Sequence, residues 1–322
     1  MDPIRNTPYD DVFRTLLIDC PALIIPVINE TFGTNYAGDE DVVFSQNEHY
    51  LTQQDGGEEK RITDSSFRIK DSTYLVECQS TADSSILIRL FEYATQIALE
   101  QGELSRSELT VTIPHTAVLF LRSTRSTPDV MLLRIVTPGG EVSFDIPVKK
   151  VKSYTLDMIF DRDLLFLIPF YIFTRENELE ECDRNEARLE ELKAEYLTII
   201  RKLDELSATG RLSAYYRSGI VDMTNAVVDN LAEKYLNVRK GVRSIMGGRV
   251  LDFEAKTILK RGIAQGRAEG RAEGRAEGEQ EQAEKTALFL LRNNMAIPFI
   301  MGATELPEDR IREIAVEHGL MQ

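Results

Sequence analysis

Three polar residues with spacing suited to chemistry stand in one short stretch of the chain, Asp64 followed by Glu77 and Gln79. The stretch from Ile62 to Gln101 predicts two strands joined by a tight turn and then a long helix. Alternation along the second strand places Glu77 and Gln79 on one face and Cys78 on the other. Carboxylates gathered on one face are typical ligands of a divalent metal ion that supports phosphodiester hydrolysis. The stretch therefore predicts a metal site of this kind.

Magnesium suits this donor set because it prefers oxygen ligands and keeps several of its waters. Asp64 and Glu77 are the expected carboxylate ligands, and the backbone carbonyl of Cys78 is a candidate third. Such a metal would polarise the scissile phosphate and lower the pKa of a bound water. Gln79 is expected to orient that water, although its uncharged amide cannot stabilise anionic charge as a lysine would.

A helix with apolar residues at helical spacing is expected from Ser84 to Gln101. Arg89 and Tyr93 lie one turn apart on it, so they would share a face near the carboxylates. Two interpretations stay open: both residues belong to the site, or Tyr93 is a core residue and Arg89 a solvent-exposed charge. The alternative for Glu77 is a buried carboxylate neutralised by Arg89, and for Asp64 a polar residue at a strand edge.

The composition leaves carboxylates as the groups for chemistry. Three cysteines and three histidines are scattered without metal-ligand spacing, so reduced thiols are expected rather than a disulfide framework or a zinc site. The net charge of −15 argues against a protein that coats nucleic acid nonspecifically. It does not exclude a nuclease, because a metal ion supplies positive charge locally. Four residues on and beside the hairpin are candidates for a small basic rim: Lys60, Arg61, Arg68 and Lys70.

Residues 1–175 predict an α/β domain in which two helices, a strand, the hairpin and the long helix follow in that order. The run AVLFL from Ala117 lacks alternation, which predicts a central strand buried on both faces. EVSFDIPV alternates and contains Pro147, which predicts an edge strand. The apolar stretch from Leu156 to Phe173 predicts helices that cover the sheet.

Residues 176–262 predict a helical extension, including an amphipathic helix around Leu189 and another helix from Met223 to Tyr235. The segment 263–283 contains the repeat GRAEGRAEGRAEG, from Gly266 to Gly278. Glycine costs a helix about 0.8–1 kcal/mol per position relative to alanine, so this repeat alone predicts a weak helix. It is interpreted either as a flexible linker or as a segment that pairs Arg and Glu stripes between subunits.

Residues 284–322 predict a helix followed by a short two-helix unit. This unit lacks a basic recognition face, so it is interpreted as a packing or protein-contact module rather than a DNA-binding helix-turn-helix. The start of the chain has neither a basic region nor an apolar region typical of a signal peptide. The longest apolar run, from Leu164, is broken by Pro169. A cytoplasmic protein without a membrane partner is expected.

The order of Asp64, Glu77-Cys78-Gln79 and then Arg89 and Tyr93 resembles the PD-(D/E)XK nuclease motif in the variant in which glutamine replaces lysine. The blocks YDDVFRTLL, LIRLFEYATQIAL and LLFLIPFYIF and the RAEG repeat are similar to those of the bacterial recombination-promoting nuclease family. The resemblance thus covers nearly the whole chain.

This resemblance implies a restriction-endonuclease-like fold, a central mixed sheet flanked by helices, with Asp64 and Glu77 as metal ligands. It places Gln79 in the lysine position and an acidic residue of the first helix, Asp11, near the site. One departure is Thr63, which stands where the motif has proline.

The resemblance also implies a magnesium-dependent DNA endonuclease, with Mn²⁺ as a substitute, acting in recombination or transposition. A homo-oligomer assembled through the repeat and the C-terminal helices is expected. A different class stays open: a nuclease-like fold with weak or no catalysis that serves as an oligomeric binding or regulatory protein. Gln79 and the net acidity favour that alternative.

Overall fold

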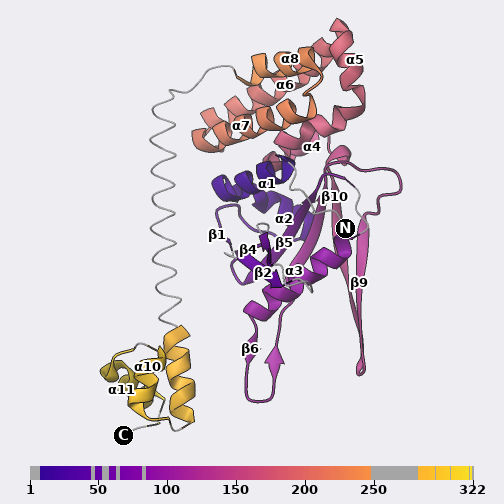
Figure 1. The fold of residues 1–322 in the computed structure, drawn as a ribbon. Helices are drawn as coiled ribbons and strands as arrows, with labels where there is room; N and C mark the ends of the chain where they lie inside the picture. Colours follow the sequence, from indigo (N-terminus) through magenta and orange to yellow (C-terminus); the bar gives the residue numbers. More distant parts are fainter. Residues whose placement is uncertain are drawn as a thin grey trace. The chain divides into compact units, whose positions relative to one another are not determined.

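The computed structural model describes residues 8–44, 48–52, 58–62, 66–81, 85–247, 282–293, 295–304, 306–318 and 320 (Figure 1). It divides into two compact units, Met1–Arg249 and Val250–Gln322. Asp64, Thr63, the loop glycines Gly56 and Gly57 and the repeat at 266–278 lie outside the described residues.

A mixed sheet of six strands forms the centre of the first unit, in the order β1-β4-β5-β8-β10-β9. β5 and β10 run parallel to β8, and the other neighbours are antiparallel. Its strands are β1 (Val42–Phe44), β4 (Ser66–Ile69), β5 (Ser72–Gln79), β8 (His115–Phe120), β9 (Val130–Thr137) and β10 (Gly140–Lys150). Two further hairpins pair β2 (Glu48–Thr52) with β3 (Glu58–Ile62) and β6 (Glu103–Leu104) with β7 (Leu109–Thr110).

Helices cover both faces of the sheet, as an α/β fold requires. One face packs its buried residues against α3 (Ile86–Glu100), whose Leu90 and Ile97 join Leu75 and Val118 in one cluster. The other face contributes to a larger cluster with the N-terminal helices and the helices that follow the sheet. These are α1 (Pro8–Asp19), η1 (Pro21–Ile24), α2 (Ile25–Phe32), η2 (Val151–Ser153), α4 (Leu156–Asp161) and η3 (Leu165–Glu178).

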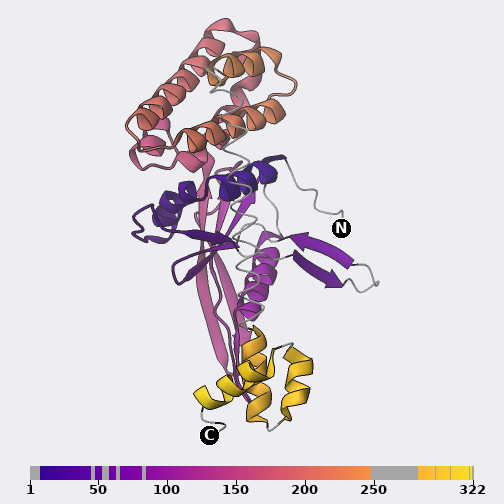
Figure 2. The ribbon, with the colours of Figure 1, turned by 90° about the vertical axis from the view of Figure 1, so that its left-hand side faces the viewer.

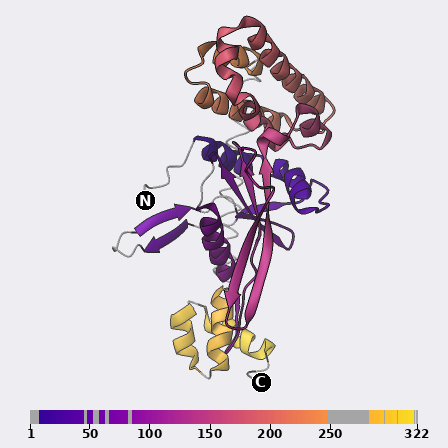
Figure 3. The same cartoon turned by 90° about the vertical axis from the view of Figure 1, so that its right-hand side faces the viewer.

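Four more helices continue the first unit: α5 (Leu179–Arg184), α6 (Glu186–Ala208), α7 (Ala214–Leu231) and α8 (Leu236–Met246). They lie together at one end of the sheet, while β9 and β10 extend toward the opposite end (Figures 2 and 3). Buried residues of α6 and α7, such as Tyr196 and Val227, belong to the same cluster as Phe166 of η3. The helix expected from Met223 to Tyr235 in fact begins at Ala214 and ends at Leu231.

The central position predicted for AVLFL is confirmed. β8 lies between β5 and β10, and its residues from Thr116 to Phe120 are all buried. Val118 and Phe120 face α3, whereas Leu119 faces the opposite cluster. The strand is apolar without alternation because both of its faces are covered.

The edge position predicted for EVSFDIPV is correct only in part, because residues 141–147 pair with one strand while β10 as a whole has two neighbours. β10 pairs with β9 along its first part and with β8 from Val148 to Lys150, so β9 is the edge strand. Pro147 is tolerated because it lies one residue before the pairing with β8 begins. The N–H of Val148 donates to the carbonyl of Asp129, so the ring nitrogen of Pro147 faces the other side, where no partner strand needs a donor.

The second unit is a small helical assembly, as the sequence predicts. It contains helical residues 282–292, α10 (Ile297–Thr304) and α11 (Glu308–Glu317) around a core of Ala287, Ile300, Ile311, Ile314 and Ala315. No helix in the described part of either unit is both long and apolar enough to cross a bilayer. All three cysteines are free and buried, which confirms the expected reduced thiols.

Candidate functional site

Strand β5 presents Glu77 and Gln79 on the face that α3 covers. Both side chains contact Arg89 of α3, while Cys78 belongs to the cluster on the other face. The alternation predicted from the sequence is therefore confirmed. Gln79 is the last residue of β5, so the pair stands at the carboxyl end of a strand that runs parallel to its neighbour β8. Carboxyl ends of parallel strands are a common location for ligand sites in α/β folds.

Arg89 is the charged centre of this arrangement. Only 6% of the residue is exposed, which excludes the interpretation as a solvent charge. Its Nη2 donates to Gln79 Oε1 at 2.8 Å and lies 3.5 Å from Glu77 Oε1, and its Nη1 lies 3.4 Å from Ser85 Oγ. Tyr93, one turn further along α3, is half-buried and packs against the core cluster on this face.

The amide of Gln79 is held at both ends. Its Oε1 accepts the bond from Arg89, and its Nε2 donates to the carbonyl of Thr81 at 2.9 Å. The orientation of the amide follows from these partners, because the end that meets a guanidinium must be the acceptor. Gln79 itself carries no charge, but a guanidinium stands within hydrogen-bond distance of it. The positive charge at this point comes from the helix rather than from the strand.

Asp10, the neighbour of the expected Asp11 in α1, is an acidic residue of the first helix whose charge acts on Glu77. Burial raises the pKa of Glu77, the charge and hydrogen bond of Arg89 lower it, and α1 contributes the charge of Asp10, which raises it, and that of Arg14, which lowers it. Asp10 also contributes to the raised pKa of Cys78, for which burial is the main cause. Asp11 is exposed, whereas Asp10 is half-buried. We call Glu77, Gln79, Arg89 and Asp10 the β5 site.

Two residues of the β5 site carry groups of the kind that a hard cation accepts. Glu77 and Asp10 offer carboxylate oxygens, which Mg²⁺ and Mn²⁺ accept as ligands. No group of three or more His, Cys, Asp or Glu suited to a metal occurs among the residues that the structure describes. Asp64 is not among them. Ser66, two residues after Asp64 in the sequence, pairs with Leu75, two residues before Glu77.

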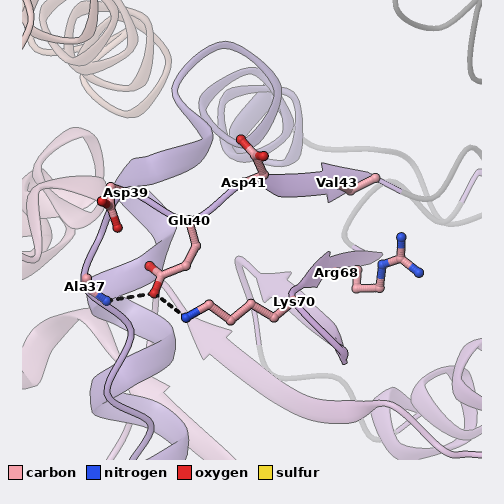
Figure 4. A pocket seen from close by; sticks show the side chains of 7 residues that line it. All are labelled: Ala37, Asp39, Glu40, Asp41, Val43, Arg68 and Lys70. Carbon is pink, nitrogen blue, oxygen red and sulfur yellow. Dashed lines mark hydrogen bonds and ion pairs between the residues drawn. The ribbon is translucent and has the colours of Figure 1, made fainter.

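Two of the expected basic rim residues lie away from the β5 site. Arg68 and Lys70 line an open pocket of about 560 Å³ at the turn end of the β4–β5 hairpin, together with Ala37, Asp39, Glu40, Asp41 and Val43 (Figure 4). The turn end is separated from Glu77 by five residues of β5, roughly 17 Å. The side chains of Lys60 and Arg61 lie outside the part of the chain that the structure describes.

Glu40 organises this pocket. Its carboxylate accepts bonds from the backbone N–H groups of Ala37 and Gly38 and from Lys70 Nζ, each at 2.9 Å. These bonds, led by that from Ala37, lower the pKa of Glu40 to about 2. Lys70 adopts a left-handed backbone conformation with φ 52° and lies over the ring of Tyr36. These contacts stabilise a turn, since Lys70 and Glu40 bind one another.

The sequence interpretation missed Arg122, the second residue after the end of β8. Its guanidinium contacts the residue after Gln79 and the helix that carries Asp10. A polar residue placed just after a buried parallel strand is a signal that could have drawn attention to it.

Comparisons with known proteins identified no relative of this chain. No family model matches the chain, and searches of curated proteins and of solved structures found no match.

Proposed function

We propose that this protein is a magnesium-dependent DNA endonuclease, and that the β5 site is its catalytic centre. The proposal rests on one observation above all: Glu77, Gln79 and Arg89 converge at the carboxyl end of a strand in a mixed sheet flanked by helices. The residues at these positions resemble the motif of a PD-(D/E)XK nuclease, and a restriction-endonuclease-like fold is part of the proposal. Recombination or transposition is the proposed setting, and a cytoplasmic homo-oligomer the proposed form.

The proposed metal ligands are Asp64, Glu77 and the backbone carbonyl of Cys78, with Asp10 as a further carboxylate from α1. A bound Mg²⁺ or Mn²⁺ would supply Lewis-acid activation of the phosphate and of a water. The residues of the chain have separate roles. Gln79, held by Arg89 and by the carbonyl of Thr81, keeps its amide in one orientation beside the carboxylate. Arg89 supplies fixed positive charge for a phosphate in a largely buried setting, where charge interactions are stronger than in water.

A second candidate function is favoured by the same contacts. The Glu77 carboxylate already has a cationic neighbour in Arg89, 3.5 Å away, which is the arrangement of an ion pair that stabilises a fold. In that case the chain is a nuclease-like protein without appreciable catalysis that binds a partner as an oligomer.

A paired cleavage assay separates the two functions. Purified protein is incubated with supercoiled plasmid in Mg²⁺ or Mn²⁺, beside Glu77→Ala and Asp64→Ala variants and the exposed Glu141→Ala as control. We expect wild type and Glu141→Ala to nick or cut DNA. Each site variant should lose at least about a hundredfold in rate, the upper range for losing even an outer-shell partner of a metal. The variants should keep the circular dichroism spectrum of the wild type.

Two outcomes would contradict the proposal. If wild-type protein leaves plasmid intact under both metals, the binding function is favoured. If Glu77→Ala and Asp64→Ala cut as fast as Glu141→Ala, the chain is a nuclease but its site lies elsewhere. A metal-dependent rise in melting temperature that is lost in both site variants is a second readout, independent of turnover.

A further inference from the structure

Arg122 connects three elements that surround the β5 site. Its Nε donates to both carboxylate oxygens of Glu176, at 2.7 and 2.9 Å, and its Nη1 donates to the carbonyl of Ser80 at 3.2 Å. Its guanidinium carbon lies 4.9 Å from the ring centre of Phe173 and 5.7 Å from that of Tyr9. One side chain thus contacts η3, the segment after β5 and the first turn of α1.

Two of the residues that Arg122 contacts are sequence neighbours of residues in the β5 site. Ser80 follows Gln79, and Tyr9 precedes Asp10. The residue before Arg122 is itself bonded to this segment, because the N–H of Leu121 donates to the carbonyl of Gln79 at 2.9 Å. A shift of Arg122 would therefore move the backbone at Gln79 and at Asp10 relative to one another.

The chemistry of arginine suits this connection. A guanidinium presents its donors in a planar fork and stacks on aromatic faces, so it serves a carboxylate, a carbonyl and two rings at once. The Tyr9 and Phe173 rings meet edge to face with centres 5.0 Å apart, which places α1 and η3 in contact beside the guanidinium. A lysine ammonium offers a point charge without the fork, and would not reproduce these contacts.

We propose that Arg122 is a positioning residue that fixes the spacing between Gln79 and Asp10. The proposal deepens the proposed nuclease function and rests on it for its catalytic consequence. A misplacement of about 1 Å between reacting groups costs up to about a hundredfold in rate, so a residue that touches no substrate still controls turnover.

Arg175 provides a matched control. It forms a comparable ion pair with Glu195, from Nη2 at 2.7 Å and Nε at 3.3 Å. The side chains of Arg175 and Glu195 are 25% and 24% exposed, against 30% and 22% for Arg122 and Glu176. Arg175 also lies in η3, and its carboxylate partners are Glu178 of η3 and Glu195 of α6, neither of which is a sequence neighbour of the β5 site. Removing either arginine therefore breaks a similar ion pair, and only one of them should disturb the site.

The first arm measures structure without activity. Hydrogen–deuterium exchange followed by mass spectrometry compares full-length wild type, Arg122→Met and Arg175→Met in two peptides, one covering 8–14 and one covering 77–82. We expect Arg122→Met to raise exchange severalfold in both peptides and Arg175→Met in neither. Glu176→Gln, which weakens the anchor but keeps the guanidinium, should give a smaller rise in the same two peptides. Unchanged exchange in either peptide of Arg122→Met would overturn the proposal.

The second arm measures cleavage. We expect Arg122→Met to lower kcat about tenfold with KM changed less than twofold, because positioning affects turnover rather than DNA binding. Arg122→Lys should not restore kcat, and Arg175→Met should keep it. Equal losses of kcat in Arg122→Met and Arg175→Met would overturn the positioning role while the nuclease function stands. If wild type cuts no DNA, the nuclease function fails, and the exchange arm alone decides whether Arg122 holds the two segments.

Discussion

Arg89 bonds Gln79 at 2.8 Å and lies 3.5 Å from Glu77, so the place for a positive charge beside the carboxylate is taken by a residue of α3. This arrangement predicts the effect of Gln79→Lys. The new ammonium would stand next to the Arg89 guanidinium and would offer no acceptor to replace Oε1. We expect a loss of about 1–3 kcal/mol in the free energy of unfolding, the usual cost of an unsatisfied buried partner. Urea denaturation measures it.

The matched control for this change removes the competing cation. Gln79→Lys combined with Arg89→Met should recover much of the stability lost in Gln79→Lys alone, because one positive charge then remains beside Glu77. If Gln79→Lys is as stable as wild type and the second substitution changes nothing, Arg89 does not exclude a second positive charge beside Glu77.

At the turn end of the β4–β5 hairpin, Glu40 should make the stability of the fold depend on pH. Its backbone N–H bonds and Lys70 lower its pKa to about 2 from a usual 4.5. The folded protein therefore binds the Glu40 proton less readily than the unfolded chain. The stabilisation is fully present above about pH 4.5 and is lost as the pH falls toward 2. Glu40→Gln should lower the melting temperature at pH 7, with a difference from wild type that shrinks below pH 4.5. Asp39→Asn, an exposed change in the same pocket, should show no such trend.

The sequence predicts residues of the β5 site to different degrees, for physical reasons. Strand alternation is a strict geometric rule, so the shared face of Glu77 and Gln79 follows from spacing alone. Adjacent helical residues point about 100° apart, so choosing between Asp10 and Asp11 requires knowing how α1 is rotated against the sheet, which local sequence does not specify. Arg122 acts through contacts with residues more than 40 positions away in the sequence, and no local pattern encodes them.

At the scale of elements, the same change in β8 and in β9 should cost very different amounts of stability. Leu119 in β8 is 2% exposed, and Leu132 in the edge strand β9 is 50% exposed. Leu119→Ala should therefore cost about 2–5 kcal/mol of unfolding free energy, the range for large-to-small changes in a core. Leu132→Ala should cost less than about 1 kcal/mol. Urea denaturation of both variants tests the strand order, because similar losses would mean that β9 is covered.

The strands themselves follow from their apolar runs, but their order does not. Pro147 favoured an edge position for β10, and the structure instead divides that strand between two partners, with the proline just before the second pairing begins. Proline is a constraint on one N–H group rather than on a whole strand. The position of an edge is set by long-range pairing, which periodicity within a strand cannot express.

At the scale of the whole molecule, the hydrophobic clusters predict where the chain can be cut. Among the residues that the structure describes, the two clusters of the first unit extend to Met246, and the cluster of the second unit begins at Ala287. A fragment ending at Arg249 should therefore keep the cooperative unfolding and the denaturant midpoint of the first unit.

A fragment ending at Arg175, the end of the α/β domain expected from the sequence, tests the other boundary. It lacks Leu192, Tyr196, Ile199, Leu203, Ile220 and Val227, all fully buried in the cluster that also contains α1 and η3. Each of these missing side chains removes roughly 1.5–3 kcal/mol of free energy gained by apolar burial. The shorter fragment should therefore be unfolded or a molten globule. Circular dichroism and urea titration of both fragments show whether the shorter one folds. If the 1–175 fragment unfolds cooperatively at the midpoint of the 1–249 fragment, the helices after Arg175 are a separate domain rather than part of the core that supports the β5 site.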